Sequence, residues 1–364
     1  MQATPLKVLA LPKYPMDGAS SRYCVHQFIP WLERAGMQCS VMPFMNTELY
    51  QLSQRSGNPW QKLGRAVGAI LRRLRLPFIA HRYDVIFIQR ELIPAVPPVL
   101  EWVLAKLGTP LVFIYDDALF IRKDNIHNPL LRLFKRPHYI LSVFRMVDCV
   151  IGSNRYLRDY AADYARRAEY LALPEDLDLI RPKSYSLKAN APVVIGWFGS
   201  PSTEKYLHLL DDVFLALARC CEFEIHVVGG GRYEHEHCKV VHKPWALNSE
   251  NADLHSFDIG IMPLPAEQWS QGKSGGKART YMAAALPAVC ADIGHNRDLI
   301  EHGKTGFLVS ATDDWVATLQ NLIADPSLRQ GIGEQARQQL ENNLSLPGQA
   351  QKLQHILESV CEQS

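Results

Sequence analysis

A glycine-rich turn that leads into a helical pattern lies at residues 272–287, GKSGGKARTYMAAALP. Glycine lets a ligand approach the backbone closely, and the N–H groups at a helix start favour an anion. The stretch holds Lys273, Lys277 and Arg279 but no Asp or Glu. These residue types predict a phosphate or diphosphate site, although their spacing fits none of the common phosphate-binding loops.

The stretch IGWFGSPSTEKYL contains a second turn of this kind. Gly199 and Ser200 separate an apolar run from a helical pattern, and Lys205 falls in the first turn of that helix. A helix start and an ammonium group suit a diphosphate. A plain helix cap by Ser202 or Thr203 is the alternative, and it leaves Lys205 unexplained.

The next apolar run ends in VVGGGRYEHEHC, where Gly229 begins a triple-glycine turn. Trp245 follows and is a candidate surface for stacking a nucleobase, with ordinary packing as the alternative. Three histidines and a cysteine lie between them and invite a metal site. They lack a recognised ligand spacing, so we expect no metal here.

In the first half of the chain, charged residues follow two apolar runs. Arg90 and Glu91 end the stretch IQRE, and Asp116 and Asp117 end IYDD. Adjacent carboxylates can orient an acceptor hydroxyl or accept its proton. Capping of the next helix is the alternative for the aspartate pair.

A turn of small residues begins the first helical pattern, at GASSRYC. Gly18, Ser20 and Ser21 would let a substrate approach the backbone and the helix start. The alternative is a loop that needs glycine only to turn.

These turns need a regular fold to hold them in position, and the sequence between them predicts such a fold. Short apolar runs rich in β-branched residues alternate with longer helical patterns, as in βαβ units around a parallel sheet. The fold class is therefore α/β, with two Rossmann-like domains that face each other across a ligand cleft at the carboxyl ends of their strands. The expected strands are 7–11, 38–42, 85–89, 111–115 and 149–152 in the first half, and 193–198, 224–228, 259–262, 288–291 and 306–309 in the second.

A chain of 364 residues suggests two domains at roughly 100–200 residues per domain. Prolines, serines and charge without periodicity mark a linker at residues 181–192. We expect an N-terminal domain over 1–184 and a C-terminal domain over 185–346. A last helical pattern, 347–364, is expected to return to the N-terminal domain.

Composition narrows the class of protein. Hydrophobic residues make up 47% of the chain and charged residues 21%, which indicates a globular protein and not a disordered one. The eight cysteines are scattered and form no CxxC pair, which favours a reducing compartment. No export signal and no run of about 20 apolar residues is visible, so we expect a cytoplasmic protein that at most lies on a membrane.

Four segments together resemble the retaining glycosyltransferases of the GT-B fold that are classed in family four. They are GASSRYCVHQFIPWLERAG, IGWFGSPSTEKYL, DIGIMPLP and GGKARTYMAAALPAVCADIGHNRDLIEHGKTGFLV. The resemblance implies transfer of a sugar from a nucleoside-diphosphate donor to an acceptor hydroxyl, with retention at the anomeric carbon and without a metal or other cofactor. It also implies that the C-terminal domain binds the donor and the N-terminal domain shapes the acceptor site.

The resemblance can be carried over residue by residue. It places Gly18 near the donor phosphates and makes Lys205 a contact of the diphosphate. Asp116 falls where many members have a histidine in the sugar site. The arginine that usually precedes the lysine is Ser200 here.

The largest departure lies in the stretch 272–287. The family usually has two glutamates separated by seven residues, and Gly272 and Thr280 hold those positions. We interpret the stretch as a variant donor loop, in which Lys277 supplies the charge that Ser200 does not. The predicted catalytic residues are Lys205, Lys277, Asp116 and Asp117; those at the donor are Gly18, Gly199, Ser200, Gly229, Trp245, Ser274, Gly275, Gly276 and Thr280; those at the acceptor are Ser20, Ser21, Arg90 and Glu91.

The acceptor domain also carries a basic segment, residues 55–82, without an acidic residue. Apolar residues at helical spacing within it predict an amphipathic basic helix, and residues 130–146 repeat the theme. Such a face suits an anionic membrane and a lipid-linked acceptor at the inner face of the cell membrane. A solvated helix with its apolar side in the core is the alternative, and nucleic acid is disfavoured because no recognition motif accompanies the charge.

Two other functions remain open from the sequence. A catalytically silent nucleotide-sugar-binding or scaffolding subunit would explain the missing glutamates. A nucleotide-sugar epimerase can share the architecture, but it would need paired carboxylates in the cleft.

Overall fold

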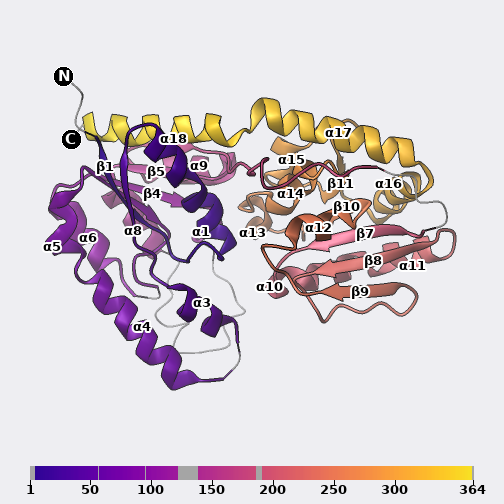
Figure 1. Cartoon of the computed structure of the whole chain (residues 1–364), viewed down its shortest axis with the longest axis horizontal. Coiled ribbons are helices and arrows are strands. Elements are labelled where there is room, and N and C mark those ends of the chain that lie inside the picture. Colours follow the sequence, from indigo (N-terminus) through magenta and orange to yellow (C-terminus); the bar gives the residue numbers. More distant parts are fainter. Residues whose placement is uncertain (1–4, 56, 95, 122–137, 186–190, 363–364) are drawn as a thin grey trace. The chain divides into compact units, whose positions relative to one another are not determined.

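The computed structural model describes residues 5–55, 57–94, 96–121, 138–185 and 191–362. The chain divides into two compact units, unit 1 (Met1–Leu173 with Leu346–Ser364) and unit 2 (Pro174–Ser345). Each unit contains a six-stranded parallel sheet with helices packed against it (Figure 1). The expected α/β class with two Rossmann-like sheets is confirmed.

The sheet of unit 1 has the strand order β2-β1-β3-β4-β5-β6. Five of its strands lie within one residue of the expected positions; four of them are buried apolar runs, and the fifth, β2, is a half-exposed edge strand. The sixth is a half-buried edge strand that the apolar pattern did not predict. The strands are β1 (Lys7–Leu11), β2 (Gln38–Val41), β3 (Val85–Gln89), β4 (Leu111–Tyr115), β5 (Cys149–Gly152) and β6 (Ala168–Tyr170).

The helices of unit 1 connect these strands in turn. They are α1 (Ala19–Cys24), α2 (Ile29–Arg34), α3 (Thr47–Gln54), α4 (Pro59–Arg73), α5 (Leu76–Ile79), α6 (Val99–Lys106), α8 (Tyr139–Met146), α9 (Arg155–Ala162) and α18 (Leu346–Glu362), with the short 3-10 helices η1 (His26–Phe28) and η2 (Ala80–Arg82).

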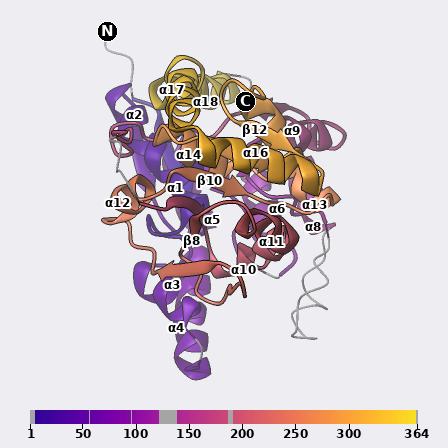
Figure 2. The same cartoon turned by 90° about the vertical axis from the view of Figure 1, so that its right-hand side faces the viewer.

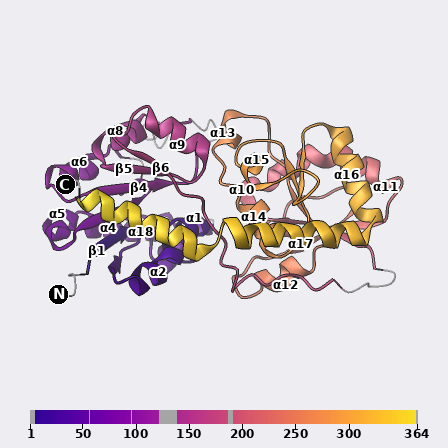
Figure 3. The same ribbon diagram turned by 90° about the horizontal axis from the view of Figure 1, so that it is seen from above.

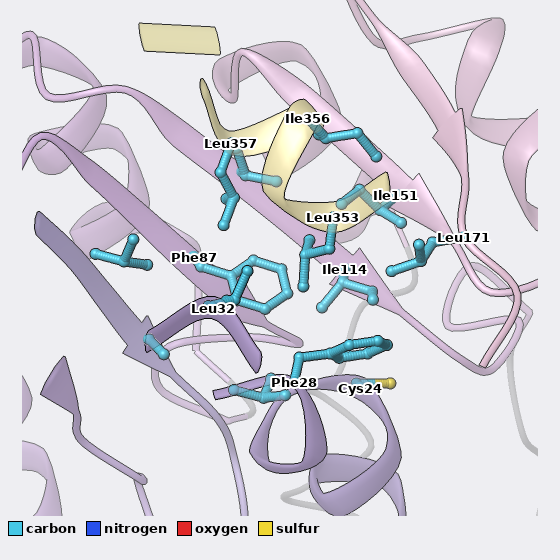
Figure 4. Close-up of a cluster of buried hydrophobic side chains, with 14 of the residues drawn as sticks. Cys24, Phe28, Leu32, Phe87, Ile114, Ile151, Leu171, Leu353, Ile356 and Leu357 are labelled. Carbon is cyan, nitrogen blue, oxygen red and sulfur yellow. The ribbon is translucent and has the colours of Figure 1, made fainter. Parts of the chain in front are cut away.

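The last helix, α18, completes the core of unit 1. Figure 4 shows Leu353 and Leu357 of α18 beside Leu32 of α2 and Phe87 of β3, all buried in one hydrophobic cluster. Burial of a leucine side chain stabilises the fold by about 1.5–3 kcal/mol. The expected return of the last helix to the first domain therefore rests on a continuous apolar face.

The sheet of unit 2 has the order β12-β11-β10-β7-β8-β9, the order of a dinucleotide-binding sheet with its switch point between β7 and β10. Five strands again match the expected positions to within one residue. The edge strand β9 was missed because its sequence, KVVHK, is short and half-exposed. The strands are β7 (Val193–Phe198), β8 (Phe223–Val228), β9 (Lys239–Lys243), β10 (Ile259–Met262), β11 (Ala288–Ala291) and β12 (Phe307–Val309).

Helices of unit 2 pack against each other as well as on the sheet. The helices α11 and α16 lie side by side (Figure 2), and α17 packs on α14 (Figure 3). The helices are α10 (Pro201–Glu204), α11 (Asp211–Ala218), α12 (Glu250–His255), α13 (Gln268–Gln271), α14 (Gly276–Ala283), α15 (Asn296–Leu299), α16 (Thr312–Ala324) and α17 (Pro326–Asn343), with the 3-10 helix η3 (Lys205–Leu210).

Unit 2 begins at Pro174, whereas the sequence analysis assigned residues 174–184 to the first domain. The Lys183 ammonium forms an ion pair with Asp258 at 2.6 Å, and the Tyr185 hydroxyl donates to the Ala285 carbonyl at 2.7 Å. These contacts are long-range in sequence, so linker composition did not reveal them. Residues 186–190 of the expected linker and 130–137 of the second basic segment lie outside the described residues.

Candidate active site

The predicted donor loop forms the start of α14. Gly275 is the N-cap of this helix and has φ of +67°, in the left-handed region. A Cβ atom at Gly275 would also lie 2.5 Å from Leu299 Cδ1. The turn therefore needs glycine for both its conformation and its space. No side chain of the described residues caps this helix start, which leaves its first N–H groups available to an anion.

Lys277 is the charged side chain in the first turn of α14. Its Nζ lies 5.1 Å from the centre of the Trp197 ring and 3.5 Å from Thr203 Oγ1. Burial, followed by repulsion from Lys273, lowers the pKa of Lys277 to about 8. Within the described part of the chain, no carboxylate forms an ion pair with this ammonium. A partly desolvated cation of this kind would gain from binding a phosphate.

Two glycines allow close packing at this site, Gly199 against the Lys277 side chain and Gly229 against Gly199. A Cβ at Gly199, directly after β7, would lie 2.6 Å from Lys277 Cε and 2.7 Å from the Trp197 ring. At Gly229, where φ is +83°, a Cβ would lie 2.1 Å from the Gly199 carbonyl oxygen and 3.2 Å from Trp245 Cβ. The structure thus brings four predicted donor residues together at the carboxyl ends of β7 and β8. We call Gly199, Gly229, Trp245 and Lys277 the Lys277 cluster.

A buried carboxylate that the sequence analysis missed holds the triple-glycine turn. Glu204 Oε1 accepts the N–H groups of Gly231 at 2.7 Å, Arg232 at 2.8 Å and Tyr233 at 3.0 Å. Burial would raise the pKa of Glu204, but these three donors outweigh it and lower the pKa. Glu204 therefore positions the turn beside the Lys277 cluster as a fixed anion.

The remaining residues of the second predicted turn lie at the surface. Ser200 follows Gly199 directly, and its hydroxyl hydrogen-bonds that of Ser202 at 2.9 Å. Lys205 is exposed at the start of η3, with Nζ 5.4 Å from the centre of the Tyr206 ring. Among the described residues, no hydrogen bond or ion pair joins Lys205 to the Lys277 cluster.

Arg279 and Thr280 face the interior of unit 2. Glu175, also buried, has Oε1 3.7 Å from Arg279 Nε and 3.1 Å from Thr280 Oγ1. The Arg279 guanidinium donates to the Ser274 carbonyl. Glu175 thus neutralises the charge of Arg279 and holds the start of α14 in place from the interior of unit 2. The Thr280 hydroxyl, expected at the donor, lies inside the protein beside Glu175 and the Gly276 carbonyl, which is 3.0 Å away.

The edge of the Lys277 cluster is formed by Trp245. The indole Nε1 donates to Glu250 at 3.0 Å, which fixes the half-buried ring. The histidines nearby serve local contacts: His235 Nε2 lies 3.1 Å from the Asp211 carbonyl oxygen. Across the residues that the structure describes, no group of three or more His, Cys, Asp or Glu is arranged to hold a metal ion.

A second polar cluster lies at the carboxyl ends of β1, β3 and β4 in unit 1. An Arg90 nitrogen is 3.9 Å from Asp117 Oδ2, and Lys13 Nζ is 3.6 Å from Glu91 Oε2. Burial alone would lower the pKa of Arg90, but Asp116, Asp117 and Glu91 outweigh it and raise the pKa. Burial and Arg90 lower the pKa of Lys13 against the pull of Glu91. We call these five residues the Arg90 cluster; the sequence analysis predicted all of them except Lys13.

Arg90 also has an unusual backbone conformation. Its φ is +63°, a left-handed value that costs a residue with a side chain about 1–3 kcal/mol. Such residues concentrate at functional sites, where neighbouring contacts hold them. The strain follows directly after buried β3, at the switch point between β1 and β3.

The two serines predicted at the acceptor are engaged within unit 1. Ser21 Oγ donates to Gln89 Oε1 at 2.8 Å, and Gln89 Nε2 donates to Ser20 Oγ at 2.8 Å. Gly18 packs on Tyr14, because a Cβ at Gly18 would lie 2.4 Å from Tyr14 Cβ. This contact accords with the alternative that the loop needs its glycine to turn. Gln89, which organises the serines, had no signal in the sequence beyond its place at a strand end.

Comparison with known proteins bears on both units. Residues 192–325 match the family model described as glycosyl transferases group 1. The structure of sucrose-phosphate synthase from Thermosynechococcus elongatus is similar, with a TM-score of 0.69, 13% identity, and coverage of 99% of this chain and 100% of that chain. The chain has the GT-B fold, and most of unit 2 is similar to the group 1 glycosyltransferase model.

Other GT-B structures agree over the whole chain. HepE from Anabaena, solved with UDP and glucose, has a TM-score of 0.66 and 17% identity, with coverage of 97% of this chain and 100% of that chain. A glycosyltransferase from Rickettsia africae has a TM-score of 0.69 and 15% identity, covering 99% and 100%. No curated protein matches the sequence. The group 1 match includes the Lys277 cluster, whereas the Arg90 cluster lies outside it.

Proposed function

We propose that the chain transfers a sugar from a nucleoside-diphosphate donor to an acceptor hydroxyl. The observation that carries this proposal is the Lys277 ammonium, which lies at a helix start, packs beside Gly199 and has no carboxylate partner among the described residues. The same fold in HepE was solved with UDP-glucose. That complex supports a uridine nucleotide as the first donor to test.

The donor diphosphate would lie over Gly199, against the N–H groups of Gly275 and Gly276 and the Lys277 ammonium. Ser200 and Ser274 would contact it from the adjoining turns, and Lys205, exposed on η3, would add a second cation. Gly229 lets the backbone pack closely between Gly199 and Trp245, and a base would stack on the half-buried Trp245 ring.

The chemical step in this proposal is a displacement on one face of the sugar. The bond from the anomeric carbon to the diphosphate oxygen breaks, and the acceptor oxygen bonds to that carbon from the same side. The acceptor proton moves to the leaving phosphate oxygen. Lys277 and the helix N–H groups stabilise the charge that develops on the diphosphate, so retention requires no protein nucleophile in the loop. Cations and main-chain donors fill the role for which a metal would otherwise be needed.

The acceptor would meet the Arg90 cluster. Asp116 and Asp117 can accept a hydrogen bond from a hydroxyl, and Arg90 holds Asp117 in place. Because the cluster pairs its cations with carboxylates, a neutral polyhydroxyl acceptor suits it better than an anionic one. We propose a glycan, lipid-linked or small-molecule acceptor, used at the cytoplasmic side.

A thermal-shift screen followed by product analysis tests the proposal. We expect UDP, GDP or ADP to raise the melting temperature, because a ligand that binds only the native state stabilises it. A matching nucleotide sugar should then release the diphosphate when an acceptor is present. If no nucleoside diphosphate raises the melting temperature, the donor site is wrong.

The same experiment separates the alternative functions. A silent binding subunit, which the missing glutamates and the buried Thr280 favour, would bind the diphosphate without releasing it from a sugar. An epimerase would change the sugar without an acceptor. Anomeric configuration of the product by NMR would test retention.

A further inference from the structure

The helix α4 lies on the side of unit 1 away from α18 (Figure 1). An apolar stripe runs along α4 and its C-cap residue, Leu74. At about 100° per residue, its five positions fall within an arc of about 80° on the helix surface. The stripe consists of Trp60, Leu63, Val67, Leu71 and Leu74, which are between 46% and 83% exposed.

The opposite side of α4 attaches the helix to unit 1. Ala69 packs in a small cluster with Phe44 and Leu49, and the buried Arg73 guanidinium donates to the Pro12 carbonyl at 2.9 Å. The helix therefore buries Ala69, Arg73 and part of Ile70, while the large apolar side chains of the stripe face outward. This arrangement is the reverse of the alternative in which the apolar side lies in the core.

The segment that carries the stripe is basic, although one of its arginines, Arg65, pairs with Glu48 of α3. The segment 55–82 contains seven Lys and Arg residues and no acidic residue. Arg55, Arg75 and Arg82 are exposed, and Arg75 directly follows the last stripe residue. The neighbouring α5 adds Phe78, which is also exposed. An apolar stripe bordered by basic side chains is complementary to anionic headgroups above acyl chains.

We propose that α4 lies in the interface of an anionic membrane, with its stripe inserted among the lipids. Interfacial helices bury their apolar face by about 5–10 Å, which side chains of this size can reach. Among the described residues, no helix is long and apolar enough to cross a bilayer. A second copy is a poorer occupant, because it would bring two basic segments together.

The contact between α4 and the rest of unit 1 lies close to the Arg90 cluster in the sequence. Arg73 is bound to the Pro12 carbonyl, and Lys13 of the Arg90 cluster is the next residue. The orientation of α4 on a membrane is thus linked through one hydrogen bond to the loop of that cluster. The inference goes beyond the proposed function and does not depend on it.

Vesicle co-sedimentation tests the proposal, using phosphatidylcholine vesicles with and without phosphatidylglycerol. We expect binding only to the anionic vesicles, weakened by high salt. The double variant Leu63→Ser with Leu71→Ser should bind about 10- to 100-fold more weakly, because two leucines no longer insert. Arg55→Gln and Arg75→Gln should each weaken binding about fivefold.

The matched control is Leu179→Ser with Leu209→Ser in unit 2. These leucines are 65% and 50% exposed, similar to Leu63 at 54% and Leu71 at 57%. Unchanged vesicle binding in this control, with UDP affinity unchanged in both variants, would support the proposal.

Three results would overturn it. The first is a wild-type protein that does not bind to anionic vesicles. The second is a control variant that loses as much vesicle binding as the stripe variant. The third is a dimer, detected by light scattering, that only the stripe variant disrupts. The last would make the stripe an interface between copies. Since vesicle binding needs no donor, such a failure would leave the proposed transferase untouched.

Discussion

The two sheets of this chain carry charge differently at their carboxyl ends. In unit 2, Lys277 lies among glycines and has no carboxylate partner within the described residues. In unit 1, Arg90 and Lys13 pair with Asp117 and Glu91. An uncompensated, partly buried cation gains most from an anionic ligand, whereas a paired network is ready to hydrogen-bond a neutral one. This difference supports our proposal that the diphosphate binds to unit 2 and the acceptor hydroxyl to unit 1.

Separate substitutions of Lys277 and Lys13 should have the largest effects and should distinguish the two units most clearly. We expect Lys277→Met to lower turnover about 100- to 1,000-fold, because the developing phosphate charge loses its main cation. Its UDP dissociation constant should rise about 10- to 100-fold. Lys13→Met should lower turnover but leave UDP affinity unchanged. Isothermal titration and diphosphate release measure the two quantities, and equal loss of UDP affinity in both variants would contradict the division of roles.

Filling the space beside Lys277 should have the next largest effect. In Gly199→Ala the new methyl group would clash with Lys277 Cε and the Trp197 ring, so the ammonium must move. We expect UDP affinity to fall about tenfold or more, since a displaced donor loses its charge-assisted bond.

Gly64→Ala is the matched control for this substitution. A Cβ at Gly64 meets nothing within 4 Å, and the residue lies in α4. Its affinity for UDP should not change, while alanine should stabilise the helix by about 0.5–1 kcal/mol. Wild-type UDP affinity in Gly199→Ala would show that the space is not part of the donor site.

Donor binding should also depend on pH in a way that separates the two units. Lys277 is charged below its pKa of about 8 and loses its proton above it. The UDP dissociation constant should therefore rise by up to about tenfold per pH unit above pH 8. The profile should be nearly flat in Lys277→Met. A wild-type profile that is equally flat to pH 9.5, roughly one and a half units above that pKa, would argue against a Lys277–phosphate contact.

The smallest effect is expected from the hydroxyls of unit 1. Ser21→Ala removes one donor from buried Gln89 and should lower the free energy of unfolding by about 1 kcal/mol. UDP affinity should be unchanged. Chemical denaturation measures the first quantity, and a large loss of turnover without a loss of stability would return Ser21 to the acceptor site.

The sequence alone predicted those features that depend on short stretches of neighbouring residues. Buried strands such as β7 are apolar runs, and Lys277 follows a glycine pair at a helix start, so both could be predicted. The supporting residues could not. Gln89 contacts the Lys13 backbone from 76 positions away, and Glu175 contacts Thr280 from 105. These contacts form only when the tertiary structure brings distant segments together, and nothing near either residue in the sequence indicates them.

The α4 stripe is a second feature that the sequence predicted only in part. Helical spacing predicted that the helix is amphipathic, but spacing cannot say which side faces the protein. The choice depends on Ala69 fitting against Phe44 and on Arg73 reaching the Pro12 carbonyl. Both contacts are tertiary.

The position of α18 has a consequence for how the chain is made. Leu353, Ile356 and Leu357 fill the core of unit 1, yet they follow the whole of unit 2 in the sequence and are synthesised after it. Until they emerge from the ribosome, the apolar surface around Leu32 and Phe87 has no cover. Unit 2 can therefore complete its core before unit 1, although most of unit 1 precedes it in the sequence.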